Sequence, residues 1–161
     1  MGTFYTLGVI KSFWAESNKK LSLSEWKTIL YDRMDLGCFE LTHDNDKLQG
    51  NLYERIFEEN IDDFYGVLKE ILGKNRNSNI DYYQKEFGTD INNYQIEYVK
   101  TQFKNKDDID ISIEFNFAML FLEGKVMAEE FYTEPVLLNW LFRNSNINNK
   151  LASCIVSNVV G

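Results

Sequence analysis

The chain has 161 residues, of which 44% are hydrophobic and 15% aromatic, and this supply of apolar side chains excludes a disordered chain. Pro135 is the only proline and the glycines are scattered, which excludes a proline-rich or Gly/Ser linker, so we expect a single globular domain over residues 1–161. The formal net charge is −8 at pH 7, with basic residues interleaved among acids, which argues against direct nucleic-acid binding. The acidity either keeps the protein in solution or attracts a basic protein partner.

The first third of the chain predicts a strand, a helix and a second strand. Residues 3–10 alternate and are rich in aromatic and β-branched side chains, as in a strand. Ser22 and Glu25 have the spacing of a capping box at a helix start. Residues 38–42 are expected to form a short strand after this helix. The helix should end before Gly37 and bury one apolar face, made of Trp26, Ile29, Leu30 and Met34.

The middle of the chain predicts a helical region followed by a loop. Residues 48–72 carry an apolar stripe at helical spacing. The acidic stretch 59–63 is expected to divide this region into two helices, with Asn60 or Asp62 capping the second. Residues 74–93 are polar and rich in asparagine, and we expect a surface loop there with one short helical turn.

The clearest β pattern lies in the last third. Residues 93–103 and 109–117 alternate and are joined by a turn, and residues 126–132 are expected to return as a third strand. A helix is expected over 133–144, and residues 150–160 form a strand or a helix, of which we favour the strand. Together these elements predict an α+β fold, an antiparallel β-meander of about four to six strands packed with three or four helices from both chain ends.

Motif chemistry points away from the common enzyme classes. The chain lacks the GxGxxG, GxxxxGK[ST] and GxSxG patterns, so we predict no cofactor. His43 is the only histidine, and its setting in ELTHDND predicts an exposed turn. One histidine and two distant cysteines, Cys38 and Cys154, do not make up a metal site, and we expect both cysteines to be reduced.

Targeting signals are not expected in this chain. The stretch MGTFYTLGVIKSFW lacks the basic and small-residue features of a signal peptide. The longest apolar run, residues 117–122, is far too short to cross a membrane. We therefore expect a cytoplasmic protein that does not contact a membrane.

Carboxylate clusters are the remaining candidates for a functional surface. Acids at helix starts and turns can simply interact favourably with the helix dipole and with solvent. Together, however, they could present a negative surface to a basic partner. Tyr82 and Tyr83 in YYQKEF would add aromatic anchors, unless they pack on the sheet as a short amphipathic turn. The acids fall into three groups: Glu58, Glu59, Asp62 and Asp63; Asp107, Asp108 and Asp110; and Glu129 and Glu130, close to Glu134.

Over about its first 40 residues the chain resembles a known family. YTLGVIKSFWAES and LSLSEWKTILYDRMDLGCFEL are similar in style and segment order to the opening of small bacterial immunity proteins of contact-dependent growth inhibition and related polymorphic toxin systems. The resemblance implies a cytoplasmic protein that binds and neutralises the C-terminal toxin domain of a cognate effector. Many such toxins are basic nucleases, which fits the acidity of this chain. The resemblance carries no catalytic residues and implies a binding protein, not an enzyme.

Two other interpretations stay open. A small enzyme could use a carboxylate pair with His43 assisting, as glycosidases use two acids. A regulatory or adaptor domain would instead bind a partner that is not a toxin. A buried pair of acids in a concave pocket would favour the enzyme, whereas a filled core with acids spread over an open face would favour a binding protein. The sequence determines neither the oligomeric state nor the activity of a toxin partner.

Overall fold

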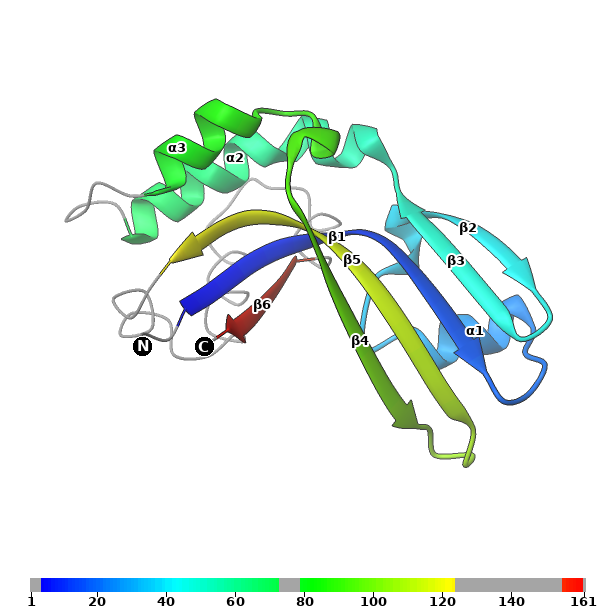
Figure 1. Cartoon of the computed structure of the whole chain (residues 1–161). Helices are drawn as coiled ribbons and strands as arrows, with labels where there is room; N and C mark the ends of the chain where they lie inside the picture. Colours follow the sequence, from blue (N-terminus) through cyan, green and yellow to red (C-terminus); the bar gives the residue numbers. More distant parts are fainter. Residues whose placement is uncertain (1–3, 73–78, 124–154, 161) are drawn as a thin grey trace.

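The computed structural model describes residues 4–72, 79–123 and 155–160 (Figure 1). Within these residues the chain forms one sheet of six strands: β1 Phe4–Ser17, β2 Phe39–Asp44, β3 Lys47–Leu52, β4 Ile96–Lys104, β5 Asp110–Glu123 and β6 Ile155–Val160. The helices of the described residues are α1 Leu23–Leu30, α2 Glu54–Leu72 and α3 Asn79–Phe87, with short 3-10 turns at Leu36–Cys38 and Ile91–Asn93. The predicted α+β fold is confirmed.

The central strand of the antiparallel sheet is β1. The strand order is β2–β3–β1–β5–β4, and β6 also pairs with β1. The N-terminal half of β1 pairs with β6 over Phe4–Val9, and its C-terminal half pairs with β3 over Ser12–Glu16. Along its other side β1 pairs with β5 from Tyr5 to Ser17. One long strand therefore joins the two hairpins, β2–β3 and β4–β5, into a single sheet.

The helix α1 packs on the half of the sheet that contains the β2–β3 hairpin. Its start is the predicted capping box: Ser22 Oγ accepts from the amide of Glu25 at 3.1 Å, and Glu25 Oε1 accepts from the amide of Ser22 at 3.0 Å. Trp26 and Leu30 point into the core and are fully buried. The expected capped helix with a buried Trp26 is confirmed.

The same half of the sheet has one buried face and one exposed face. Along β1, Phe13 and Ala15 are buried, whereas Trp14 and Glu16 are exposed. This alternation follows from the period of two residues in a strand, which places successive side chains on opposite faces. The face that carries Phe13 belongs to the core that also contains Trp26.

A close contact between β1 and β3 fixes the packing of this core. Gly50 is paired with Phe13 across the two strands, and the Phe13 ring meets the ring of Phe39 edge to face at 5.1 Å between centroids. A Cβ atom added to Gly50 would lie 2.2 Å from the Phe13 ring. The ring therefore fills the space that a side chain at position 50 would need.

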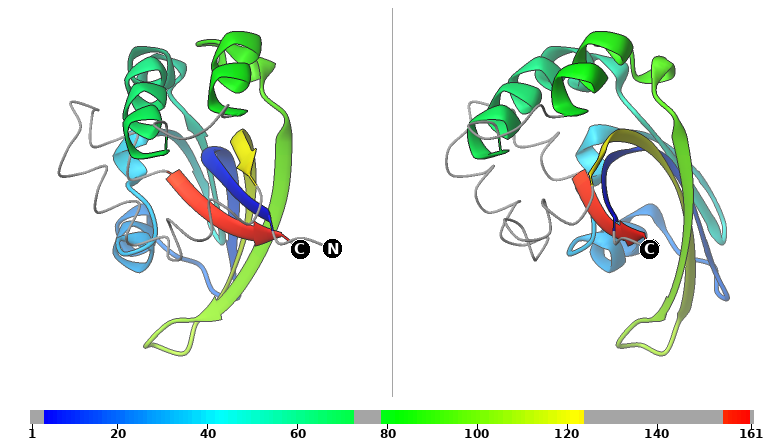
Figure 2. Two further views of the ribbon diagram at one scale, coloured as in Figure 1. Left: turned by 90° about the vertical axis from the view of Figure 1, so that its left-hand side faces the viewer. Right: turned by 60° about the vertical axis from the view of Figure 1, so that its left-hand side comes forward.

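The helices α2 and α3 lie at the end of the molecule opposite the β4–β5 turn (Figures 1 and 2). Phe57 and Tyr65 of α2 are fully buried, and Phe57 meets Tyr94 edge to face at 5.4 Å. The Tyr65 hydroxyl donates to the carbonyl of Leu120 on β5 at 2.8 Å, and the Tyr94 hydroxyl donates to the carbonyl of Gly88 at 2.7 Å. The two hydroxyls lie 3.2 Å apart. These tyrosines attach the helices to β5.

This tyrosine pair predicts a loss of stability at alkaline pH. Burial raises the pKa of Tyr94 from 10.0 to about 12, and burial, reinforced by Tyr94, raises the pKa of Tyr65. Because the folded state holds these protons more tightly than the unfolded chain, the stabilisation is complete below about pH 10 and is lost as the pH rises towards 12. Urea unfolding between pH 8 and pH 12 should show this decline.

The variant Tyr94→Phe tests the origin of the decline. It should be less stable at pH 8 by about 1 kcal/mol, because it lacks the hydrogen bond to Gly88, but its stability should fall less steeply above pH 10. Tyr31→Phe is the matched control, since Tyr31 is 81% exposed. If the free energy of unfolding fell equally steeply above pH 10 in the wild type and in Tyr94→Phe, the decline would not come from Tyr94.

Two predictions for the middle of the chain are wrong. Residues 48–52, expected at the start of a helix, belong to β3, where Leu48 and Leu52 are buried. The stretch 59–63 does not interrupt α2, which runs unbroken over 19 residues. Asn60 stays inside the helix because its Nδ2 donates to the carbonyl of Ile56 at 2.7 Å, so neither Asn60 nor Asp62 caps a second helix.

Other elements differ from prediction in length. Residues 79–87 form a nine-residue helix in place of the expected short helical turn, because its apolar side packs on the core. The strands β1 and β5 each reach 14 residues, well beyond the predicted 3–10 and 109–117. The favoured strand near the chain end is confirmed over Ile155–Val160. The strand predicted at 126–132 and the helix predicted over 133–144 lie outside the described residues.

Candidate functional site

Four of the predicted interface acids lie together on the solvent side of α2. Glu58, Glu59, Asp62 and Asp63 are all exposed, and we call these four residues the acidic helix surface. Helical spacing arranges them in two i,i+4 rows, Glu58 with Asp62 and Glu59 with Asp63. Arg55 forms an exposed ion pair with Glu59 at 3.5 Å, which contributes little in water. The other three carboxylates form no ion pair with any side chain that the structure describes, and they face solvent.

The neighbouring helix α3 is attached to α2 by polar contacts. Asp62 Oδ1 accepts from Gln84 Nε2 at 3.3 Å, and Lys69 Nζ lies 2.8 Å from Asp81 Oδ1 and also donates to Gln84. These contacts place Asp62 at the junction of the two helices. They leave Glu58, Glu59 and Asp63 on the outer side of α2.

Tyr82 and Tyr83, the predicted aromatic anchors, separate into two roles. Tyr82 is 58% exposed, and its ring meets that of Tyr83 edge to face at 5.5 Å between centroids. Tyr83 is half-buried and packs on the core together with Phe87, and this burial raises its pKa. Asp81 is held towards α2 by Lys69, and Tyr82, one residue later, projects about 100° further round the helix. Tyr82 therefore lies on a different side of α3 from the acidic helix surface.

The second acidic group belongs to the β4–β5 turn. Lys104 Nζ lies 3.3 Å from Asp108 and 3.7 Å from Asp110, and Asp110 Oδ2 accepts from Asn18 Nδ2 at 3.2 Å. Asp108 has a positive φ of 65°, a turn conformation that aspartate tolerates. The turn therefore accounts for the presence of Asp107 and Asp108. It lies at the far end of the molecule from α2 (Figure 1). The structure does not bring the two groups together, and Glu129 and Glu130 lie outside the described residues.

No carboxylate is buried among the side chains that the structure describes. The one buried polar side chain among them is Asn60. Within the same residues, no group of three His, Cys, Asp or Glu side chains is arranged to hold a metal ion. The described acids are thus spread over the surface of the described residues.

His43 and Cys38 lie in or beside β2. His43 is exposed, but it stands in a strand instead of the expected turn, and its Nε2 contacts the carbonyl of Leu21 at 2.6 Å. Because a carbonyl accepts hydrogen bonds, Nε2 carries the proton of that contact. Cys38 is buried.

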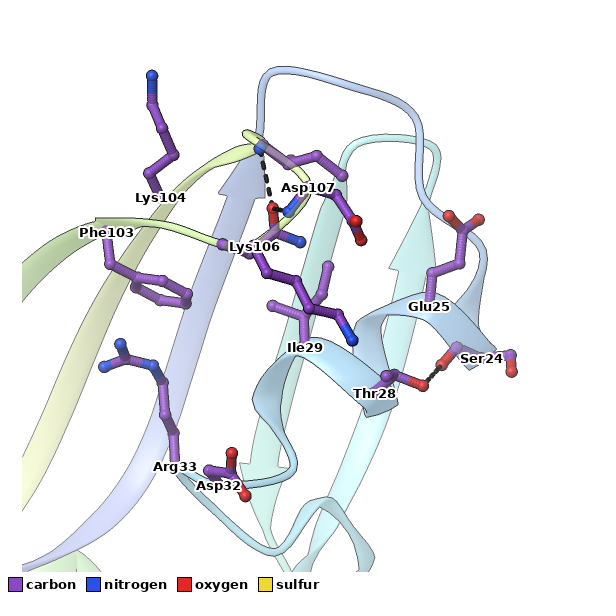
Figure 3. Close-up of a pocket in the computed structure, with 12 residues that line it drawn as sticks. Ser24, Glu25, Thr28, Ile29, Asp32, Arg33, Phe103, Lys104, Lys106 and Asp107 are labelled. Carbon is purple, nitrogen blue, oxygen red and sulfur yellow. Dashed lines mark hydrogen bonds between the residues drawn. The ribbon is translucent and has the colours of Figure 1, made fainter.

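A cleft between α1 and the β4–β5 hairpin was not foreseen from the sequence (Figure 3). Its volume is about 720 Å³, and Ile29, Phe103 and Ile109 give it an apolar lining. The guanidinium of Arg33 stacks on the Phe103 ring, with Cζ 3.6 Å from the ring centroid. Lys106 extends from the hairpin towards α1 (Figure 3).

The sequence holds little signal for this cleft. Arg33 follows α1, while Phe103 and Lys106 belong to a hairpin some 70 positions further along the chain. Only the pairing of β1 with β5 brings the two segments together. The acids at its rim are Glu25, Asp32 and Asp107, of which Glu25 has its pKa lowered by the hydrogen bonds of the capping box.

Comparisons with family models, with curated proteins and with solved structures find no match to this chain. The resemblance to immunity proteins over the first 40 residues therefore stays a prediction. In the described part of the chain, no helix combines the length and the apolar character needed to cross a membrane.

Proposed function

We propose that the chain is an immunity protein that binds the basic C-terminal toxin domain of a contact-dependent growth inhibition or related polymorphic toxin system. The single observation that carries the proposal is the acidic helix surface on α2. Four exposed carboxylates stand in two rows on one regular helix, and Arg55 is the one cation within residues 54–66. Binding at this surface neutralises the toxin in the cytoplasm.

The electrostatics support this partner class. A surface of one sign raises the rate of association with an oppositely charged partner by roughly 10 to 1,000-fold. The backbone that carries these carboxylates is anchored, because Phe57, Ile61, Phe64 and Tyr65 pack the other side of the helix in the core. Like charges at i,i+4 are slightly unfavourable for an isolated helix, so these acids do not serve the stability of α2. A basic partner would remove their mutual repulsion.

Co-expression with a defined candidate partner tests the proposal. The full chain would be produced together with the polypeptide encoded immediately upstream of its gene, and the mixture analysed by size-exclusion chromatography with light scattering. We expect a stoichiometric complex that tightens at low salt, together with protection of cells that express the toxin domain.

A folded chain that neither forms the complex at low salt nor protects cells would contradict the proposal. If the chain protects cells but the affinity of the complex does not depend on salt, the immunity role is supported, and the role of the acidic helix surface in binding is contradicted.

A further inference from the structure

The cleft between α1 and the β4–β5 hairpin has a charge pattern that the acidic helix surface does not explain. Of its three cations, Lys104 is paired with Asp108 and Asp110. Arg33 and Lys106 form no ion pair with any side chain that the structure describes. Both cations are exposed and able to donate charge-assisted hydrogen bonds to an anion in the cleft, whose lining also carries Glu25, Asp32 and Asp107.

The position of Arg33 favours a carboxylate. Stacking on Phe103 covers a face of the guanidinium and fixes its plane, while the N–H groups at its edge remain able to donate. Two parallel N–H groups match the two oxygens of a carboxylate. The ammonium of Lys106 extends from the opposite wall towards α1 and adds a second positive charge (Figure 3).

The remaining lining limits the ligand further. Ile29, Phe103 and Ile109 offer apolar contact, and 720 Å³ is the size of a typical small-molecule site. Glu25, Asp32 and Asp107 at the same cleft would repel a multiply charged ligand, so a polyphosphate or nucleic acid fits poorly. We propose that this cleft binds a small carboxylate with a single negative charge and an apolar body, held by Arg33 and Lys106.

Three small probes distinguish the contribution of the carboxylate to binding from that of the apolar body. Benzoate carries both, acetate carries only the carboxylate, and benzyl alcohol carries only the ring. Titration of the ¹⁵N-labelled full chain, followed by amide and arginine side-chain NMR signals, should give saturable shifts with benzoate within residues 24–33 and 103–109. Acetate and benzyl alcohol should each bind roughly tenfold more weakly or less.

Variants then test the named residues. Arg33→Gln and Lys106→Ala should each weaken benzoate binding by roughly tenfold, since each removes a charged donor. Lys100→Ala is the matched control, because Lys100 pairs with Glu114 on the sheet and does not line the cleft. Lys106 is exposed in a turn, so Lys106→Ala keeps the test valid if Arg33→Gln unfolds the protein.

Scattered shifts, or equal shifts with benzoate and benzyl alcohol, would overturn the proposal. So would an unchanged affinity in the folded Lys106→Ala variant, or an equal loss in Lys100→Ala. Because the acidic helix surface lies at the other end of the molecule, these outcomes do not depend on the proposed toxin partner (Figure 1).

Discussion

Neutralising the acidic helix surface is expected to slow association with a cationic partner by roughly tenfold or more at low salt. The variant is Glu58→Gln, Glu59→Gln, Asp62→Asn and Asp63→Asn, which removes four negative charges without changing the size of the side chains. Association rates measured by stopped-flow mixing or surface plasmon resonance should also depend less on salt, because the charges that salt screens are gone. Dissociation rates should change much less.

The variant should fold as well as the parent chain. All four side chains are exposed, so their replacement leaves no buried group unpaired. Removing like charges at i,i+4 should relieve about 0.2–0.5 kcal/mol per pair. After Asp62→Asn the new side chain can still accept from Gln84 through its amide oxygen. A change in rate is therefore attributable to the charge of the surface.

Matched double variants locate the effect. Glu58→Gln with Asp62→Asn, and Glu59→Gln with Asp63→Asn, each remove two charges from one row of α2. Glu40→Gln with Asp44→Asn removes the same charge from exposed positions on β2. If the β2 pair slows association as much as either helix pair, net charge and not the acidic helix surface controls the rate.

Gly50→Ala is expected to destabilise the fold by about 2–3 kcal/mol, which corresponds to a fall of about 5–10 °C in Tm. A Cβ atom at this position would lie 2.2 Å from the ring of Phe13. The ring cannot move aside freely, because it is 3% exposed and packs on Phe39. Urea or thermal unfolding followed by circular dichroism measures the loss.

Two further variants test whether the loss of stability comes from the contact between position 50 and Phe13. In a Phe13→Leu background the clash is smaller, so Gly50→Ala should cost less there than in the parent chain, and the two effects should not add. Gly66→Ala should instead stabilise the protein by about 0.5–1 kcal/mol, because a Cβ at this helical position meets nothing within 4 Å. Equal effects of alanine at positions 50 and 66 would contradict the packing argument.

The sequence predicted those elements whose signals are local. Ser22 and Glu25 define a capping box three residues apart, and both residues make the expected hydrogen bonds. The alternating stretches around the KNKDD turn form the β4–β5 hairpin for the same reason. Leu48 and Leu52 misled the prediction, because a spacing of four residues places side chains on one side of either a helix or a strand. Leu48 pairs with Ala15 of β1 and Leu52 pairs with Phe39 of β2, and this pairing decided for the strand.

The candidate sites show the same limit. The acids of α2 were predicted as a group because they are neighbours in the sequence, although their place within one unbroken helix was not foreseen. The cleft depends on Arg33 and Phe103, which meet only after the sheet has formed, so no local pattern marks it. Pairing between distant segments thus forms the cleft, whereas acids that are neighbours in the sequence form the acidic helix surface.

The central position of β1 has a consequence for biosynthesis. This strand leaves the ribosome before its partners, since the register joins Tyr5 to Glu123 on β5 and Phe4 to Val160 on β6. At typical rates of translation the wait for β6 is on the order of ten seconds, and until then the edge of β1 over Phe4–Val9 that pairs with β6 has no partner strand. We expect the nascent chain to need protection by chaperones over this interval, and the sheet to close only late in synthesis.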